Sequence, residues 1–96
     1  MRPSVALERH RDAVRALIAQ HRVVNGRVFG SVAAGTDTED SDLDLLVDTL
    51  PGTTMFDLCE LNEDLEALLG VKVDLMTPGS VSKSIRRHVL AAAEPL

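Results

Sequence analysis

The sequence predicts an α/β fold, a small mixed β-sheet flanked by helices. Apolar residues recur at helical spacing in three stretches, and short apolar runs typical of buried strands lie between them. The expected order is helix, strand, helical turn, strand, helix, strand, helix, and this alternation is characteristic of α/β proteins. With 96 residues, of which 45% are hydrophobic and 26% charged, residues 1–96 are expected to form a single domain around one core.

The first helix is expected from about Ser4 to His21. Its apolar residues fall on one stripe, namely Leu7, Val14, Leu17 and Ile18, with His21 as an ambiguous member. The pair Asn25-Gly26 is a turn signal, which predicts that the helix has ended and that the first strand covers Arg27 to Phe29. We expect His10 and His21 to be solvated or packed, since no cysteine or further histidine stands at ligand spacing.

A helical turn is expected from Ser31 to Ala34, and Gly35 ends it. The polar, acidic loop from Thr36 to Ser41 is interpreted as a surface loop rather than as a source of chemistry. A second strand is expected from Asp42 to Asp48. Because strand side chains alternate, its two faces should carry Leu43, Leu45 and Val47 on one side and Asp42, Asp44 and Leu46 on the other.

The second long helix should follow a turn at Leu50 to Gly52, with Thr53 or Thr54 as its cap. It should run to Leu69, and Gly70 is a C-terminal stop. Its core stripe is expected to contain Leu58, Leu61, Leu65, Leu68 and Leu69. Cys59, within this helix, is expected to be a small buried or half-buried residue.

The third strand is expected from Val71 to Met76. Alternation places Val71, Val73 and Leu75 on one face and Lys72, Asp74 and Met76 on the other. After a turn, the last helix should run from about Val81 to Ala92, with Val81, Ile85 and Val89 packed inward. Its basic residues, Lys83, Arg86, Arg87 and His88, are interpreted as a solvated face, with a phosphate or partner contact as the alternative.

Composition narrows the class of function. The net charge is −5, and the aromatic residues are two Phe with no Trp or Tyr. Direct nucleic-acid binding is therefore not expected, because it normally needs a basic stripe or stacking aromatics. An acidic surface suits a basic protein partner. One cysteine and no long apolar run favour a cytoplasmic protein without a membrane span or disulfide.

The stretch from Val28 to Val47 carries the candidate chemistry. It begins with Gly30 and Ser31, a small pair that lets a backbone approach a bulky anion. Asp42 and Asp44 share a strand face, with Cα atoms about 6 to 7 Å apart, and would repel each other without a cation. A magnesium ion prefers such oxygen ligands. A solvated strand end and an ordinary Ser31 helix cap are the simpler alternatives.

Asp74 adds a third acid to the hypothesis. If the third strand lies beside the second, Asp74 can meet Asp42 and Asp44 across the sheet, since neighbouring strands are about 5 Å apart. Three acids would need a cation even more. Taken alone, an Asp in a strand is often only a surface residue.

Together these residues resemble a known signature. Gly30, Ser31 and Gly35, followed by the run from Ser41 to Val47, are similar to the G-S-x-x-x-G and S-D-x-D-L-L-V motifs of the DNA polymerase β-like nucleotidyltransferases. The resemblance extends over nearly the whole chain to the minimal nucleotidyltransferases, the MntA-like antitoxin partners of HEPN-domain toxins. One position departs from the family, which usually has Arg before the second Gly, where this chain has Ala34.

The resemblance implies a minimal nucleotidyltransferase fold and a metal-dependent enzyme. Asp42, Asp44 and Asp74 would bind two Mg²⁺ ions, and Gly30 and Ser31 would bind the phosphates of ATP. Asp74 would also activate the attacking hydroxyl. The reaction implied is transfer of AMP to a Tyr hydroxyl of a cognate HEPN ribonuclease toxin, with which the protein would form a hetero-oligomer.

Two other functions compete with this hypothesis. The same fold could neutralise the toxin by stoichiometric binding with little or no catalysis, which Ala34 and the small size favour. The intact acids at 42, 44 and 74 disfavour it, because clustered acids without a use only destabilise the fold. A small-molecule nucleotidyltransferase of the aminoglycoside-modifying kind is disfavoured by length, because no second lobe exists to close over a sugar.

Overall fold

The computed structural model describes all residues, 1–96, and contains a four-stranded sheet with helices on both faces. The elements are α1 (Pro3–Gln20), β1 (Val23–Phe29), α2 (Gly30–Ala34), β2 (Leu43–Thr49), α3 (Met55–Leu69), β3 (Val73–Met76), the 3₁₀ turn η1 (Pro78–Ser80), α4 (Lys83–Ala92) and β4 (Glu94–Pro95). The strand order is β3-β2-β1-β4. The β2–β3 pair is parallel and the other pairs are antiparallel, so the predicted mixed sheet is confirmed.

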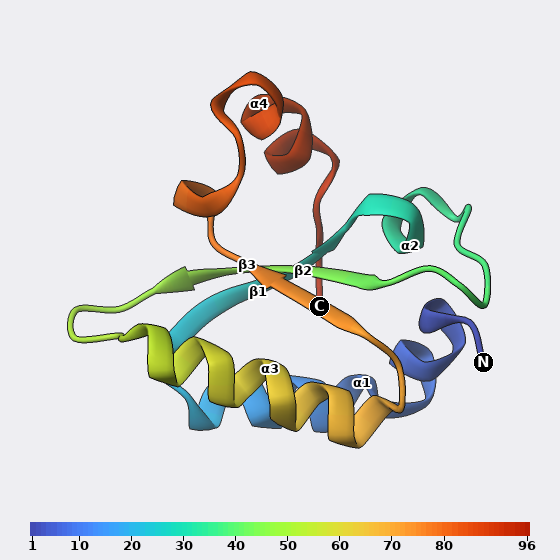
Figure 1. The fold of residues 1–96 in the computed structure, drawn as a ribbon, viewed down its shortest axis with the longest axis horizontal. Helices are drawn as coiled ribbons and strands as arrows, with labels where there is room; N and C mark the ends of the chain where they lie inside the picture. Colours follow the sequence, from blue (N-terminus) through green and yellow to red (C-terminus); the bar gives the residue numbers. More distant parts are fainter.

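The hydrophobic core lies between the sheet and the two long helices. In Figure 1, α1 and α3 lie side by side against one face of the sheet, whereas α2 and α4 lie on the other. The core side chains include those of the predicted stripes, among them Leu7, Val14, Leu43, Leu45, Leu61 and Leu65. Leu46 and Val81 are buried outside this core. None of the helices combines the length and the apolar composition needed to cross a membrane.

The expected turn at Asn25-Gly26 is wrong, because β1 continues through both residues. Val24 pairs with Asp48 and Arg27 pairs with Leu46, so two residues of β1 stand opposite the single residue between those partners. This is a β-bulge. Asn25 has φ 58°, which asparagine tolerates better than most residues, and its side-chain amide donates to Asp48 at 2.9 Å. Asn25-Gly26 therefore forms a bulge within β1 instead of a turn before it.

The cap of α3 is confirmed at Thr54. The Thr54 hydroxyl accepts from the Asp57 N–H at 3.2 Å, and the Asp57 carboxylate accepts from the Thr54 N–H at 2.9 Å. This reciprocal pair is a capping box. Cys59, however, is exposed, not buried as expected. Its neighbour Leu58 points toward the core, and the next position on a helix is rotated by about 100°.

The end of the chain differs from the expectation in two ways. The last helix begins at Lys83, so Val81 is buried ahead of it, and Ile85 is 51% exposed instead of packed. The short strand β4 was not predicted. It pairs with β1, and the N–H of Leu96 donates to the carbonyl of Gly26 at 3.1 Å. Two residues are too few to show a strand period, and proline at position 95 is tolerated because β4 is an edge strand.

The loop between α2 and β2 is attached to the first helix. Asp37 is 7% exposed, and its carboxylate accepts a hydrogen bond of 2.9 Å from the backbone N–H of Ser4, in the first turn of α1. Within the loop, the Ser41 hydroxyl accepts from the N–H of Thr38 at 2.8 Å, and the Ser41 N–H donates to the Thr38 carbonyl at 3.1 Å. Asp37 thus acts as a helix cap supplied from a distant segment.

Replacing Asp37 by alanine is expected to lower Tm by several degrees, because Ser4 loses its cap. The Ser4 N–H holds the pKa of Asp37 below its ordinary value. The ionised cap therefore stabilises the fold above the pKa of the unfolded chain and is lost as pH falls through the folded pKa. Asp37→Asn keeps an acceptor oxygen but no charge. Its Tm deficit, measured by circular dichroism, should be full above the ordinary pKa of an aspartate and should shrink as pH falls through the lowered pKa of Asp37; a deficit independent of pH would contradict the role of the charge.

Candidate active site

The candidate site lies on the sheet face opposite the core. Asp44 of β2 stands in register with Asp74 of the parallel strand β3 and with Phe29 of β1. Asp42 precedes β2 by one residue. The expectation that the third strand lies beside the second, with Asp74 next to Asp44, is therefore confirmed.

Gly30 approaches Asp44 so closely that no side chain fits there. It follows β1 directly, has φ +69°, and begins the five-residue helix α2. A Cβ at this position would lie 2.1 Å from Oδ2 of Asp44. Both the left-handed backbone and the nearby carboxylate thus require glycine. The motif residues 30 and 44 form a contact in space.

The acids of the site repel one another. Burial raises the pKa of Asp44 above its ordinary value, and the negative charges of Asp74 and then Asp42 raise it further. The nearest cation to Asp42 is Lys72, whose Nζ lies 4.0 Å from Oδ2, with side chains 75% and 42% exposed. Such an exposed ion pair contributes little. The unfavourable charge of Asp44 is therefore left for a bound cation to neutralise.

A hard divalent cation fits the chemistry of these three residues. Carboxylate oxygens are the ligands that Mg²⁺ prefers, and such an ion would reverse the repulsion that raises the pKa of Asp44. The carboxylate oxygens of Asp42, Asp44 and Asp74 do not all lie within 4.8 Å of one another.

A different trio has the tighter arrangement. His21, Glu60 and Asp64 place one ligand atom each within 4.8 Å of the others, at the end of α1 and on α3. Nε2 of His21 lies 3.3 Å from the Asp64 carboxylate, and the His21 side chain is only 10% exposed. The trio belongs to the helical layer across the sheet from Asp44, and the contact between His21 and Asp64 joins the end of α1 to α3.

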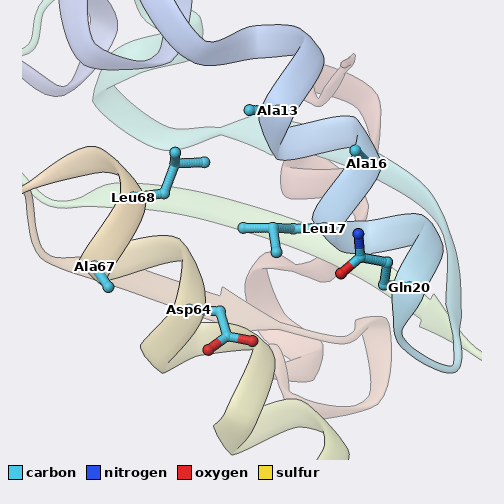
Figure 2. Close-up of a pocket in the computed structure, with 7 residues that line it drawn as sticks. All are labelled: Ala13, Ala16, Leu17, Gln20, Asp64, Ala67 and Leu68. Atoms are coloured by element: carbon cyan, nitrogen blue, oxygen red, sulfur yellow. The ribbon is translucent and has the colours of Figure 1, made fainter.

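The pocket in Figure 2 also lies in this helical layer. Ala13, Ala16 and Leu17 of α1 face Ala67 and Leu68 of α3 across about 470 Å³, and the polar lining is Gln20 and Asp64. The acid cluster of the candidate site, which consists of Asp42, Asp44 and Asp74, contributes no residue to its lining. This pocket is therefore separate from the candidate active site.

Ser31 and Ala34 lie in α2, where the sequence analysis places the helical turn. Ser31 is half-buried in the first turn and Ala34 is exposed near its end. Arg86 of α4, which was expected on a solvated basic face, is instead half-buried. Its Nη2 donates to the carbonyl of Val81 at 3.0 Å, while its Nε is the one buried side-chain nitrogen or oxygen without a partner. No sequence signal distinguishes this arginine from its neighbour Arg87.

Comparison with known proteins assigns the chain to a family. The sequence matches the family described as "Nucleotidyltransferase domain" over residues 7–94. The chain belongs to the nucleotidyltransferase domain family. A protein of Methanocaldococcus jannaschii, provisionally named a protein adenylyltransferase, is 34% identical over 77 residues, which are 80% of this chain and 83% of that protein. The protein adenylyltransferase MntA of Thermococcus cleftensis is 46% identical over 63 residues, 66% of this chain and 64% of MntA.

Solved structures show the same nucleotidyltransferase fold. A structure provisionally described as a minimal nucleotidyltransferase is 46% identical, with a TM-score of 0.87 over 97% of this chain and 95% of that one. A toxin–antitoxin structure solved with AMP-PNP shares the fold at 23% identity, with a TM-score of 0.75 over 88% of this chain and 69% of that one. The resemblance drawn from Gly30, Ser31, Asp42 and Asp44 is confirmed at the level of the family and its minimal fold.

Proposed function

We propose that this nucleotidyltransferase transfers AMP from ATP to a hydroxyl of a partner protein. The observation that carries the proposal is the position of Asp44, between the backbone of Gly30 on one side and Asp74 on the other. The similarity to protein adenylyltransferases supports a protein acceptor. The likeness to toxin–antitoxin structures supports an antitoxin, and the motif resemblance points to a Tyr of a HEPN-domain toxin as acceptor.

In the proposed reaction, the oxygen of the acceptor hydroxyl forms a bond to the α phosphorus of ATP. The bond from that phosphorus to the bridging oxygen breaks, and pyrophosphate leaves with the electron pair. Asp74 takes the proton of the hydroxyl, for which its exposed carboxylate on β3 is suited. The products are an AMP ester of the partner and pyrophosphate.

The phosphates would be bound at the start of α2. The first backbone N–H groups of a helix have no partner within it, and the missing side chain of Gly30 leaves them open to an anion. Ser31 adds a hydroxyl in the same turn. Asp42, Asp44 and Asp74 would hold Mg²⁺, two ions by resemblance to the family. When bound, the metal supplies positive charge that balances the triphosphate and the developing charge of the reaction.

The first experiment is the intact mass of a cognate HEPN-domain protein co-expressed with this chain. A gain of one or more AMP units with the wild type, but not with Asp42→Asn/Asp44→Asn, would establish the transferase. If neither form adds mass while both hold the partner in a tight complex, the result would favour the alternative function, neutralisation of the toxin by stoichiometric binding. Ala34 favours that alternative, since it is an exposed alanine where the family usually has arginine.

The Asp74→Asn variant distinguishes between two roles for Asp74, that of a general base and that of a metal ligand. If Asp74 accepts the proton of the acceptor, its replacement should lower kcat about 10²- to 10⁴-fold and leave the KM for ATP within a few-fold of wild type. Steady-state transfer to the partner at several ATP concentrations gives both constants. A large rise in the KM for ATP with kcat nearly unchanged would instead make Asp74 only a ligand.

A further inference from the structure

A groove adjoins the candidate site on the side away from Gly30. It encloses about 530 Å³ between α3, the outer edge of β3 and the segment that follows β3. Asp74 lines it together with Met55, Leu58, Cys59, Glu63 and Thr77. The groove thus reaches Asp74, the residue that the proposed function assigns to the acceptor hydroxyl.

The strand order separates the two substrates of the proposed reaction. Asp44 lies in the middle, Asp74 stands beside it on β3, and Gly30 follows its neighbour on β1. Phosphates bound at Gly30 would therefore approach Asp44 from the side of β1 and α2. The side of β3, where the groove lies, is left for the acceptor.

The edge of β3 is closed to an added strand. The N–H of Val73 donates to a Glu66 carboxylate oxygen at 2.8 Å, and the N–H of Leu75 donates to Oδ1 of Asn62 at 3.1 Å. An incoming chain would find these donors occupied by α3, so it could not extend the sheet by ordinary main-chain pairing. The occupant must be recognised mainly through its side chains.

The lining selects a basic and partly apolar occupant. It contains Glu63, Glu66 and Asp74 and no basic residue, so a triphosphate would be repelled there while a lysine or arginine would be attracted. At the beginning of α3, Met55 is 71% exposed and Phe56 is 87% exposed. Met and Phe are enriched at protein–protein interfaces relative to the rest of the protein surface.

We propose that this groove binds the acceptor segment of the partner protein. The segment would place its hydroxyl at Asp74, a basic side chain against Glu63, and an apolar side chain on Met55, which lines the groove. The inference rests on the proposed function, because it takes that partner as the acceptor. It adds a recognition surface that neither ATP nor the metal needs.

The single cysteine allows a direct test. Cys59 is exposed and lines the groove, so N-ethylmaleimide should add to it and fill part of the space. The adduct is expected to lower the affinity for the HEPN-domain protein about tenfold or more, while calorimetry shows unchanged ATP affinity. The Cys59→Ser variant, compared before and after the same treatment, must not respond. Unchanged partner affinity of the fully modified protein would overturn the proposal.

A charge reversal tests the same surface without a bulky group. Glu63 is exposed on α3, and Glu63→Lys should lower partner affinity and raise the KM for the partner about tenfold, with ATP affinity retained. Asp12→Lys makes the same change in charge on α1, where the side chain is 98% exposed and outside the groove. Equal losses in both variants would mean that only net charge matters and would overturn the groove.

These outcomes are distinct from failure of the proposed function. If the untreated protein binds the partner without transferring AMP, the transferase proposal fails, yet the affinities of the adduct and of Glu63→Lys still decide the groove. If AMP is transferred and neither change affects the partner, the transferase stands and the groove is wrong. Absence of any complex with the untreated protein would contradict both.

Discussion

Replacing Gly30 by alanine is expected to abolish nucleotide transfer. The new Cβ would lie 2.1 Å from Oδ2 of Asp44, a distance at which the carboxylate must move. Displacement of a catalytic group by about 1 Å can lower the rate about 10²-fold, and the loss here should be at least that large. The left-handed backbone adds strain of about 1 to 2 kcal/mol for alanine.

Gly70→Ala is the matched control for Gly30→Ala. Gly70 also has φ +69°, but a Cβ added there, at the end of α3, would have no other atom within 4 Å. Both variants should be destabilised by a similar strain, measured by urea unfolding, and only Gly30→Ala should lose transfer. Normal activity of Gly30→Ala would show that Asp44 can move without harm, which contradicts its proposed role.

The second large effect is expected from Asp42→Asn/Asp44→Asn. Transfer should fall about 10³-fold or more, since the variant removes the charge that is proposed to bind the metal. In metal-free buffer the same variant should unfold at a higher temperature than wild type, because the repulsion that raises the pKa of Asp44 is relieved. Loss of activity together with gain of stability is the signature of a functional cluster.

The stability difference between the double variant and wild type should depend on pH. The pKa of Asp44 is raised in the folded state, so the folded protein binds more protons there than the unfolded chain, and stability falls as pH rises through this interval. The advantage of the double variant should therefore be present near pH 7 and absent near about pH 3. Thermal unfolding in EDTA at both values measures it.

Magnesium should reverse the order of stability. Added Mg²⁺ should raise the Tm of wild type and leave that of the double variant nearly unchanged, because a ligand stabilises only the form that binds it. Asp12→Asn/Asp40→Asn removes the same charge from two positions outside the acid cluster and should behave as wild type. A Tm of wild type that does not respond to Mg²⁺ would argue against the metal site.

Much of the fold could be predicted from periodicity. The stripes of α1 and α3 and the alternation of β2 extend over many residues, so tertiary contacts reinforce the local pattern. The prediction failed where the pattern is short or the signal has two uses. Asn25-Gly26 favours a turn and a bulge equally well, and β4 has only two residues. Ile85 follows a helical stripe, yet α4 leaves it largely exposed.

Some features of the candidate site could likewise be predicted from the sequence, and others could not. The pairing of Asp44 with Asp74 follows from strand alternation once the two strands are neighbours. The contact of Gly30 with Asp44 depends on how α2 leaves β1, which no local pattern encodes. Asp37 and Ser4 are 33 residues apart, and nothing in the sequence between them indicates their hydrogen bond. Local rules find candidates, whereas only the assembled sheet shows which of them meet.

The hydrogen bond between Asp37 and Ser4 also lowers the conformational entropy that the loop from Thr36 to Ser41 would lose when substrate binds. The loop from Thr36 to Ser41 joins the end of α2 to Asp42. Motion of this loop would therefore displace both α2 and Asp42 within the site. It is fixed to α1 near one end and closed by the Thr38–Ser41 pair near the other. A short restrained loop has little conformational entropy left to lose. Folding therefore already restrains this loop before the proposed nucleotide binds.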